Sequence, residues 1–177
     1  MVIRSQAITA DDFLAYAGQH PETRFDFIDG ELVEVAPKPL HGWLQVRAIR
    51  LLGNWLDEHP IGHLHSEVLH VLDGVKFIPD ISINRALAND ASYFTEPPLL
   101  AIEIRPDTQS REAQRRKARQ YIAHGTPVVI LLMPDEHIEV FTADGGDDPR
   151  IYGMDDLIEN LPGFEGLMFA VKDVLAR

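Results

Sequence analysis

Two carboxylates, Asp80 and Glu103, interrupt stretches that otherwise read as buried β-strands. Asp80 lies within VKFIPDISI and Glu103 within LLAIEIR, and both segments are mainly apolar. An ionised carboxylate buried without a partner costs several kcal/mol, so each acid requires a cation nearby. If the two strands are neighbours, the acids converge, and a divalent cation removes both their repulsion and the cost of burial. Ligation by oxygen alone suits Mg²⁺ or Mn²⁺.

A basic helix expected after the second strand supplies a further group for this chemistry. Its residues Lys117 and Tyr121 are four apart and therefore lie on one face. Hydrolysis of a phosphodiester requires a cation and also a positive group near the attacking water and the developing charge. Lys117 is the first candidate for that group. Arg105 is a rival for electrostatic stabilisation, although a guanidinium stays protonated and cannot act as a base.

Each of these residues also has a structural explanation that involves no catalysis. Asp80 could cap a turn at the end of a strand, and Lys117 could be a solvated residue of a basic helix. Glu103 could form a buried ion pair with Arg105 or with a cation of the helix. From these residues alone, the two explanations for Asp80 are about equal.

A competing metal site is suggested by His63, His65 and Glu67, which alternate along one expected strand and so face the same way. Two histidines and a carboxylate are the ligand set of a non-haem iron centre. Ligands at this spacing on one strand seldom complete such a site, so a polar, solvent-facing strand face is the preferred interpretation.

The rest of the sequence predicts the elements that position these residues. A helix capped by Thr9 is expected to end at Gly18, and a second helix to run from His41 to about Glu58. A third, capped by Asp107 or Thr108, is expected to end at His124. RFDFIDGELVEV predicts a hairpin with its turn at Asp29-Gly30. The further predicted strands are GHLHSEVLHVL, VKFIPDISI, LLAIEIR, VVILLM and HIEVFT, followed from Met154 by a tail with one or two helical turns.

Length and composition favour a single domain over residues 1–177. The sequence has no apolar run of about 18 residues and no secretory signal pattern, so no membrane contact is expected. The absence of cysteine fits a cytoplasmic location. The net charge of −12 counts against nucleic acid as a partner. The basic segment SREAQRRKAR counts in favour of it, because its positive charges are clustered.

The order of Pro79-Asp80, Glu103-Ile104-Arg105 and the Lys117 helix resembles the PD-(D/E)XK nuclease superfamily, and more narrowly its Uma-type restriction-endonuclease family. The resemblance implies an α/β, restriction-endonuclease-like fold: a mixed β-sheet flanked by helices, with an N-terminal β-hairpin. It also implies that Asp80 and Glu103 are metal ligands. The lysine that the superfamily carries on the strand after the glutamate would here lie on the following helix, as Lys117. The matching segments cover nearly the whole chain: TADDF, FDFIDGELVEV, PKPLHGWL, FIPDISI, AIEIRPDTQSREAQRRKARQYIAHG, VVILLMPDEHIEVF and LPGF.

The resemblance implies a homodimer as well, because one such unit cuts one strand. Glu31 and His41 fall at recurrent family positions; we interpret Glu31 as part of a cross-strand pair and keep His41 as a catalytic candidate. Two features depart from the family pattern. Arg105 stands where the superfamily has lysine, and Arg105-Pro106-Asp107-Thr108 replaces a usual Ser-Pro-Ser segment.

We therefore expect a divalent-metal-dependent endonuclease that hydrolyses phosphodiester bonds of nucleic acid, with DNA as the expected substrate and Mg²⁺ or Mn²⁺ as the cofactor. The alternative is a catalytically degenerate nuclease fold that serves as a binding or dimerisation module. The acidic charge and the two departures favour that alternative. The catalytic candidates are Asp80, Glu103, Lys117, Arg105 and His41, of which the first two are the metal ligands.

Overall fold

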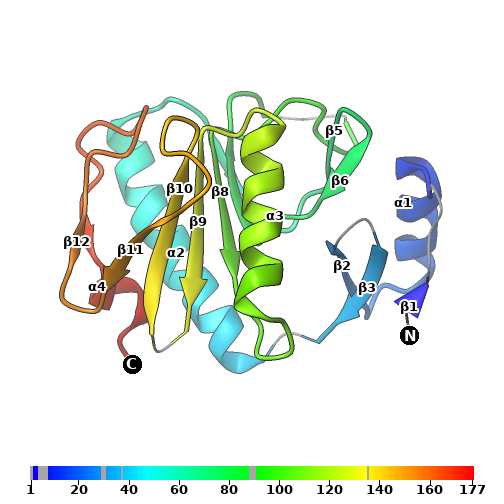
Figure 1. The fold of residues 1–177 in the computed structure, drawn as a ribbon. Coiled ribbons are helices and arrows are strands. Elements are labelled where there is room, and N and C mark those ends of the chain that lie inside the picture. The colour runs from blue at the N-terminus through cyan, green and yellow to red at the C-terminus, as the bar shows by residue number, and fades with distance from the viewer. Residues whose placement is uncertain (1, 4–7, 29–30, 37, 88–90, 135) are drawn as a thin grey trace.

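A six-stranded mixed β-sheet forms the centre of the protein, as a computed structural model shows (Figure 1). The strand order is β11-β10-β9-β8-β7-β4; β8 and β9 are parallel and the other neighbours antiparallel. The structure describes residues 2–3, 8–28, 31–36, 38–87, 91–134 and 136–177. The strands are β4 (His63–His65), β7 (Ile81–Asn84), β8 (Leu100–Ile104), β9 (Val128–Met133), β10 (His137–Thr142) and β11 (Arg150–Gly153).

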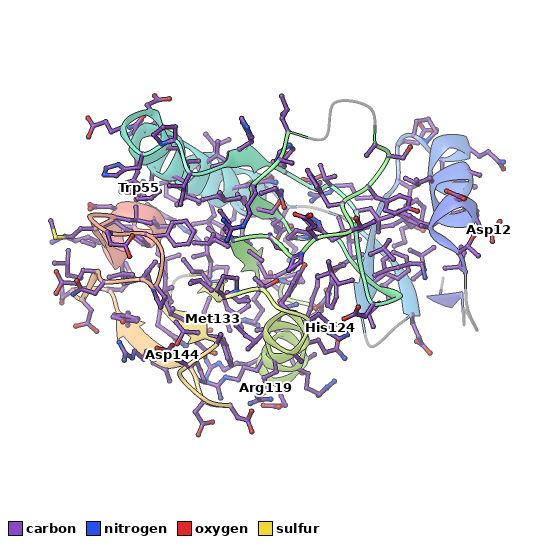
Figure 2. The ribbon with its side chains drawn as sticks, turned by 90° about the horizontal axis from the view of Figure 1, so that it is seen from above. Asp12, Trp55, Arg119, His124, Met133 and Asp144 are labelled. Carbon is purple, nitrogen blue, oxygen red and sulfur yellow. The ribbon has the colours of Figure 1, made fainter. Side chains whose placement is uncertain are left out.

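Helices cover both faces of this sheet. Helix α2 (Pro39–Glu58) lies on one face and α3 (Arg111–Ala123) on the other, as the positions of Trp55 and Arg119 in Figure 2 show. The sheet flanked by helices confirms the predicted α/β fold class. Within the described residues, no helix combines the length and the apolar character needed to cross a membrane.

Alternation along β8 decides which side chains meet which helix. Leu100, Ile102 and Ile104 belong to the apolar core beneath α2, whereas Ala101 packs in the core beneath α3. Successive side chains of a strand point to opposite faces, so Glu103 faces α3 together with Ala101. The sheet therefore presents a carboxylate to the basic helix, as the sequence predicts.

A smaller three-stranded sheet with the order β1-β3-β2 lies beside the main sheet (Figure 1). The predicted hairpin is confirmed as the antiparallel pair of β2 and β3, and its Asp29-Gly30 turn lies outside the described residues. Phe13 of the N-terminal helix packs edge-on against Phe27 with ring centroids 5.1 Å apart. These elements are β1 (Val2–Ile3), β2 (Arg24–Ile28), β3 (Glu31–Val35) and α1 (Ala10–Gln19).

Two strands that the sequence predicts as continuous are each broken in the structure. GHLHSEVLHVL is interrupted at Glu67, whose φ is 57°, and VKFIPDISI is interrupted at Pro79-Asp80. Proline has no N–H to donate to a strand ladder, and a positive φ turns the chain out of the extended conformation. The pieces nearest the Asp73-Gly74 turn form their own hairpin, β5 (His70–Leu72) with β6 (Val75–Phe77).

Two boundaries also differ from the sequence prediction. The Ser110 hydroxyl accepts a hydrogen bond of 3.1 Å from Ala113 N, so α3 is capped by Ser110 and not by Asp107 or Thr108. Beyond β10 the chain adds strands that the sequence did not predict, because segments of two to four residues are too short to show alternation. Besides β11, the tail holds β12 (Leu157–Ile158), β13 (Phe169–Ala170) and the expected helical turns, α4 (Val171–Leu175).

A buried histidine links β5 to β7. His70 is fully buried; its Nδ1 lies 2.9 Å from the Val68 carbonyl oxygen and its Nε2 2.9 Å from Asn84 Oδ1. The ring also stacks on Phe94 at a centroid distance of 5.0 Å. Burial lowers the pKa of His70 from its ordinary value, although both hydrogen bonds act in the opposite direction.

Stability is expected to fall as pH drops below about 6.5, because unfolded His70 then binds a proton that folded His70 resists. One proton contributes a slope of at most about 1.4 kcal/mol per pH unit. His70→Gln should remove this contribution, and urea unfolding at a series of pH values measures it. An equal slope in wild type, His70→Gln and the exposed-site control His63→Gln would contradict this expectation.

Candidate active site

Asp80 and Glu103 stand opposite each other at one end of the β7–β8 pair. The antiparallel register joins Ile81 to Ile102, and one step further brings Asp80 level with Glu103. Asp80 Oδ2 accepts a hydrogen bond of 2.7 Å from Ile104 N, which fixes the Asp80 carboxylate against β8. Asp80 directly precedes β7, and its charge is near enough to raise the pKa of Glu103, so the two carboxylates lie close together on the wall of one cavity.

Glu103 is buried and accepts hydrogen bonds from two groups of α3. Lys117 Nζ lies 2.8 Å from Glu103 Oε2, and the Tyr121 hydroxyl donates to Oε1 at 2.8 Å. Glu103 is 3% exposed and Lys117 5% exposed, so water is almost excluded from this ion pair. The structure thus contains one of the two ion pairs considered for Glu103, the pair with a helix cation. It also rules out a solvated Lys117.

A third carboxylate, Asp26 of β2, completes the surroundings of Lys117. Lys117 Nζ donates to Asp26 Oδ1 at 2.7 Å and to Oδ2 at 2.8 Å. The sequence analysis missed Asp26, which precedes Lys117 by 91 residues and lies between Phe25 and Phe27 in a hairpin strand. A polar residue between two apolar ones is the ordinary pattern of a half-exposed strand, so no local signal marks it.

Burial dominates the electrostatics of these groups. It raises the pKa of Glu103 to about 8; Lys117 acts against this shift, and the charges of Asp26 and Asp80 add to it. Burial likewise raises the pKa of Asp26. Burial by itself lowers the pKa of Lys117, but Asp26 and Glu103 more than offset that effect, so its pKa is raised. The Lys117 ammonium therefore stays charged. Its single positive charge does not offset the effect of burial on Asp26 and Glu103, whose pKa values remain raised.

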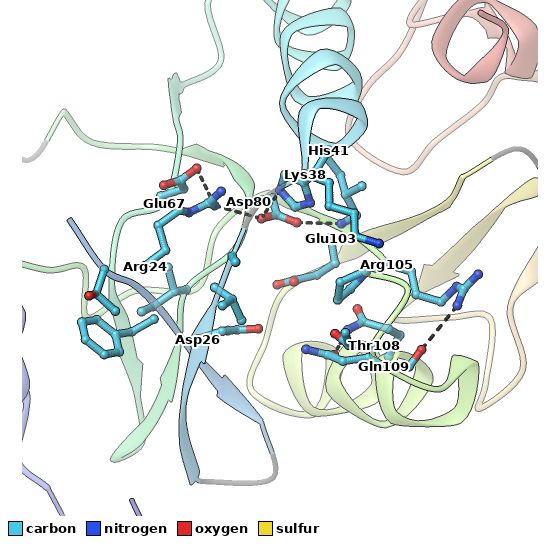
Figure 3. A pocket seen from close by; sticks show the side chains of 18 of the residues that line it. Arg24, Asp26, Lys38, His41, Glu67, Asp80, Glu103, Arg105, Thr108 and Gln109 are labelled. Atoms are coloured by element: carbon cyan, nitrogen blue, oxygen red, sulfur yellow. Dashed lines mark hydrogen bonds and ion pairs between the residues drawn. The ribbon is translucent and has the colours of Figure 1, made fainter. Parts of the chain in front are cut away.

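Asp80 contacts a different set of side chains, shown in Figure 3. His41, in the first turn of α2, places Nε2 3.1 Å from Asp80 Oδ1. Arg24 approaches the same oxygen at 3.6 Å and forms a shorter ion pair with Glu67. Gln45 Nε2 donates to the backbone carbonyl of Asp80 at 3.0 Å. His41 thus lies within the site, as a residue that contacts a proposed metal ligand.

Arg105 points away from Glu103, toward Gln109 (Figure 3). One of its terminal nitrogens is 3.4 Å from the Gln109 carbonyl oxygen and the other 3.1 Å from Glu136 Oε1. The guanidinium therefore stabilises the segment between β8 and α3. Its place on the wall of the adjoining cavity is what connects Arg105 to the site.

Much of the positive charge of the basic segment is neutralised within the protein. Three of its arginines form ion pairs: Arg111 with Glu136, Arg115 with Glu139, and Arg119 with Glu112. The Arg115 pair is bidentate, with Nε and a terminal nitrogen 2.8 and 2.7 Å from the two oxygens of the fully buried Glu139. The helix therefore offers less positive charge to a polyanion than its sequence suggests.

The alternative iron site at His63, His65 and Glu67 is not formed in the described structure. Strand β4 ends at His65, and the positive φ of Glu67 directs the chain so that its carboxylate pairs with Arg24. His65 Nδ1 instead lies 3.2 Å from Asn84 Nδ2. In the part of the chain that the structure describes, no three histidine, aspartate or glutamate side chains gather as a preformed metal site.

A cavity of about 460 Å³ opens beside the carboxylates. Asp26, Asp80 and Glu103 contribute to its wall, together with Lys38 and His41. Apolar side chains of α1 and the small sheet line one part, and the loop between β8 and α3 lines another. The cavity is therefore large enough to hold a molecule larger than water beside these acids.

Comparison with known proteins decides the family. Residues 10–172 match the Uma2 family, which is described as "Putative restriction endonuclease". The chain belongs to the Uma2 family. A search of curated proteins found no match.

The Uma2 chain also resembles a solved structure, a "putative nuclease belonging to DUF820" from Anabaena variabilis ATCC 29413. The TM-score is 0.79 at 23% sequence identity, over 96% of this chain and 98% of that one. The likeness shows a shared fold along almost the whole length of both chains.

Replacing Lys117 with Met is expected to destabilise the protein by about 3–5 kcal/mol, the typical cost of leaving a buried charge without its partner. The methionine keeps the length of the stem but leaves Asp26 and Glu103 without their shared cation. Urea unfolding at neutral pH measures the change. Lys38→Met is the control, because the ion pair of Lys38 with Asp107 is exposed and its loss should hardly alter stability. Equal unfolding free energies for the two variants would contradict the expectation.

Proposed function

We propose that this Uma2 chain is a divalent-metal-dependent endonuclease that hydrolyses phosphodiester bonds of nucleic acid, with Asp80 and Glu103 as the metal ligands. The observation that carries the proposal is the convergence of these two acids at the end of β7 and β8, with Lys117 bonded to one of them. The family description supports the reaction class.

The donor groups fit a hard divalent cation. Each carboxylate oxygen has two lone pairs, and Asp80 Oδ2 and both Glu103 oxygens each accept one protein hydrogen bond in the described structure. Mg²⁺ is commonly held by one or two carboxylates while it keeps several waters, so a third protein ligand is not required. An added positive charge would also stabilise ionised Glu103, whose pKa is raised to about 8 by burial.

The roles of the side chains follow from their contacts. A divalent cation at Asp80 and Glu103 would stabilise negative charge on the phosphate under attack. Lys117 stays protonated, so it donates hydrogen bonds to the attacking water or a phosphate oxygen and does not act as a base. His41 holds one oxygen of Asp80 and thereby orients that carboxylate. Arg105 lines the cavity, but its guanidinium is paired with Glu136 and bonded to Gln109, so its role is to hold the loop between β8 and α3.

The proposal extends to the substrate and the assembly. We propose DNA as the nucleic acid and Mg²⁺ or Mn²⁺ as the ion. We also propose one restriction-endonuclease-like domain over residues 1–177 and a cytoplasmic homodimer in which each copy cuts one strand. The overall charge of −12 opposes approach of a polyanion, and added salt screens that repulsion.

A second candidate function is binding without catalysis. The ion pairs of Lys117 with Asp26 and Glu103 compensate the buried acids in part without a metal ion. A nuclease fold that had lost its reaction could keep this arrangement as a structural element and serve as a nucleic-acid-binding or dimerisation module.

Titration with Mn²⁺ separates the two functions. At a hundred times the dissociation constant, Mn²⁺ should raise the unfolding free energy of wild type by roughly 2.7 kcal/mol, and DNA cleavage should appear. Asp80→Ala should show neither response, because one of the two ligands is gone. Thermal or urea unfolding and a gel-based cleavage assay provide the measurements.

The exposed acid Glu159 provides a control, and Glu159→Ala should retain both responses. Failure of wild type to respond to Mn²⁺ in either assay would overturn the nuclease proposal. DNA binding without turnover, unaffected by Glu103→Gln, would instead favour the binding module.

A further inference from the structure

We propose that Asp26 is a positioning residue, which holds Lys117 in the site while Glu103 is released from Lys117 to bind a divalent cation. This inference rests on the proposed function and assigns the N-terminal hairpin a part in it. Asp26 comes from β2 of the small sheet, whereas Glu103 lies in β8 of the main sheet and Asp80 directly precedes β7.

The contacts of Lys117 are unequal in a way that permits this exchange. Its Nζ lies 2.7 and 2.8 Å from the two oxygens of Asp26 and 2.8 Å from a single oxygen of Glu103. Loss of the Glu103 contact would leave the ammonium with both oxygens of a buried carboxylate. Lys117 therefore needs no new partner when Glu103 changes its own.

The charges of the site point the same way. Asp26 and Glu103 share the one ammonium of Lys117, and Asp80 adds a third negative charge nearby. An additional cation would therefore be attracted to these three acids. Without Asp26, Glu103 would be the only acidic partner of Lys117 among the described residues, and Lys117 would compete with a cation for that carboxylate. Asp26 removes the competition by supplying an acceptor that does not belong to the metal site.

Asp26 could alternatively act only as an anchor that attaches the small sheet to α3. An anchor would affect stability alone, whereas a positioning residue would also change the affinity of the site for a cation. The second effect should depend on Lys117, because the competing group is its ammonium.

Calorimetric titration with Mn²⁺ distinguishes these roles in wild type, Asp26→Asn, Lys117→Met and the double variant. Asp26→Asn should weaken Mn²⁺ binding by roughly tenfold to a hundredfold, the usual range for a residue that orients a metal ligand. In the Lys117→Met background the same substitution should have a clearly smaller effect, since only the loss of a negative charge remains. Asp26→Glu keeps the charge and should bind Mn²⁺ within a few-fold of wild type.

Glu139→Gln is the matched control, because Glu139 is also a buried carboxylate paired with a cation of α3. It should lower stability and leave the Mn²⁺ affinity unchanged. An equal effect of Asp26→Asn with and without Lys117, or no effect on affinity, would overturn the inference while leaving the nuclease proposal intact. If Asp26→Asn does not fold, Asp26→Ser replaces it in the same comparison with and without Lys117, and the same two results support or overturn the inference. Absence of Mn²⁺ binding by wild type would overturn both proposals.

Discussion

One ammonium group shared by two buried carboxylates connects the separate parts of this protein. Lys117 joins α3 to Glu103 of the main sheet and to Asp26 of the small sheet. Burial makes each carboxylate costly to ionise, and the single cation offsets only part of that cost. The same interaction thus contributes to folding and leaves a site that favours additional positive charge.

The sequence predicted the proposed chemistry where it depends on local geometry. Alternation along LLAIEIR placed Glu103 opposite the α2-facing core, and the four-residue spacing placed Lys117 and Tyr121 on one helix face. In the structure both residues contact Glu103. The hairpin of β2 and β3 also follows from a short-range pattern, whereas the mixed sheet was implied by the family resemblance.

What the sequence could not supply depends on long-range packing. Asp26 reaches Lys117 only because the small sheet docks beside α3, and its own strand looks ordinary. Long-range packing also changes the expected roles of Arg105 and of the basic segment. Glu136 and Glu139, at and just before β10, form ion pairs with arginines whose partners the sequence does not reveal. The positive φ of Glu67 likewise separates it from His63 and His65, which the sequence offered together as an alternative iron site.

The central claim is that Asp80 and Glu103 together hold one divalent cation. A crystal soaked in Mn²⁺ and measured at an energy where manganese scatters anomalously tests it directly. The prediction is a single strong peak at about 2.1 Å from a carboxylate oxygen of each residue, with Lys117 still bonded to Asp26. A crystal with no peak there, in which Glu103 remains bonded to Lys117 at saturating Mn²⁺, would contradict the claim.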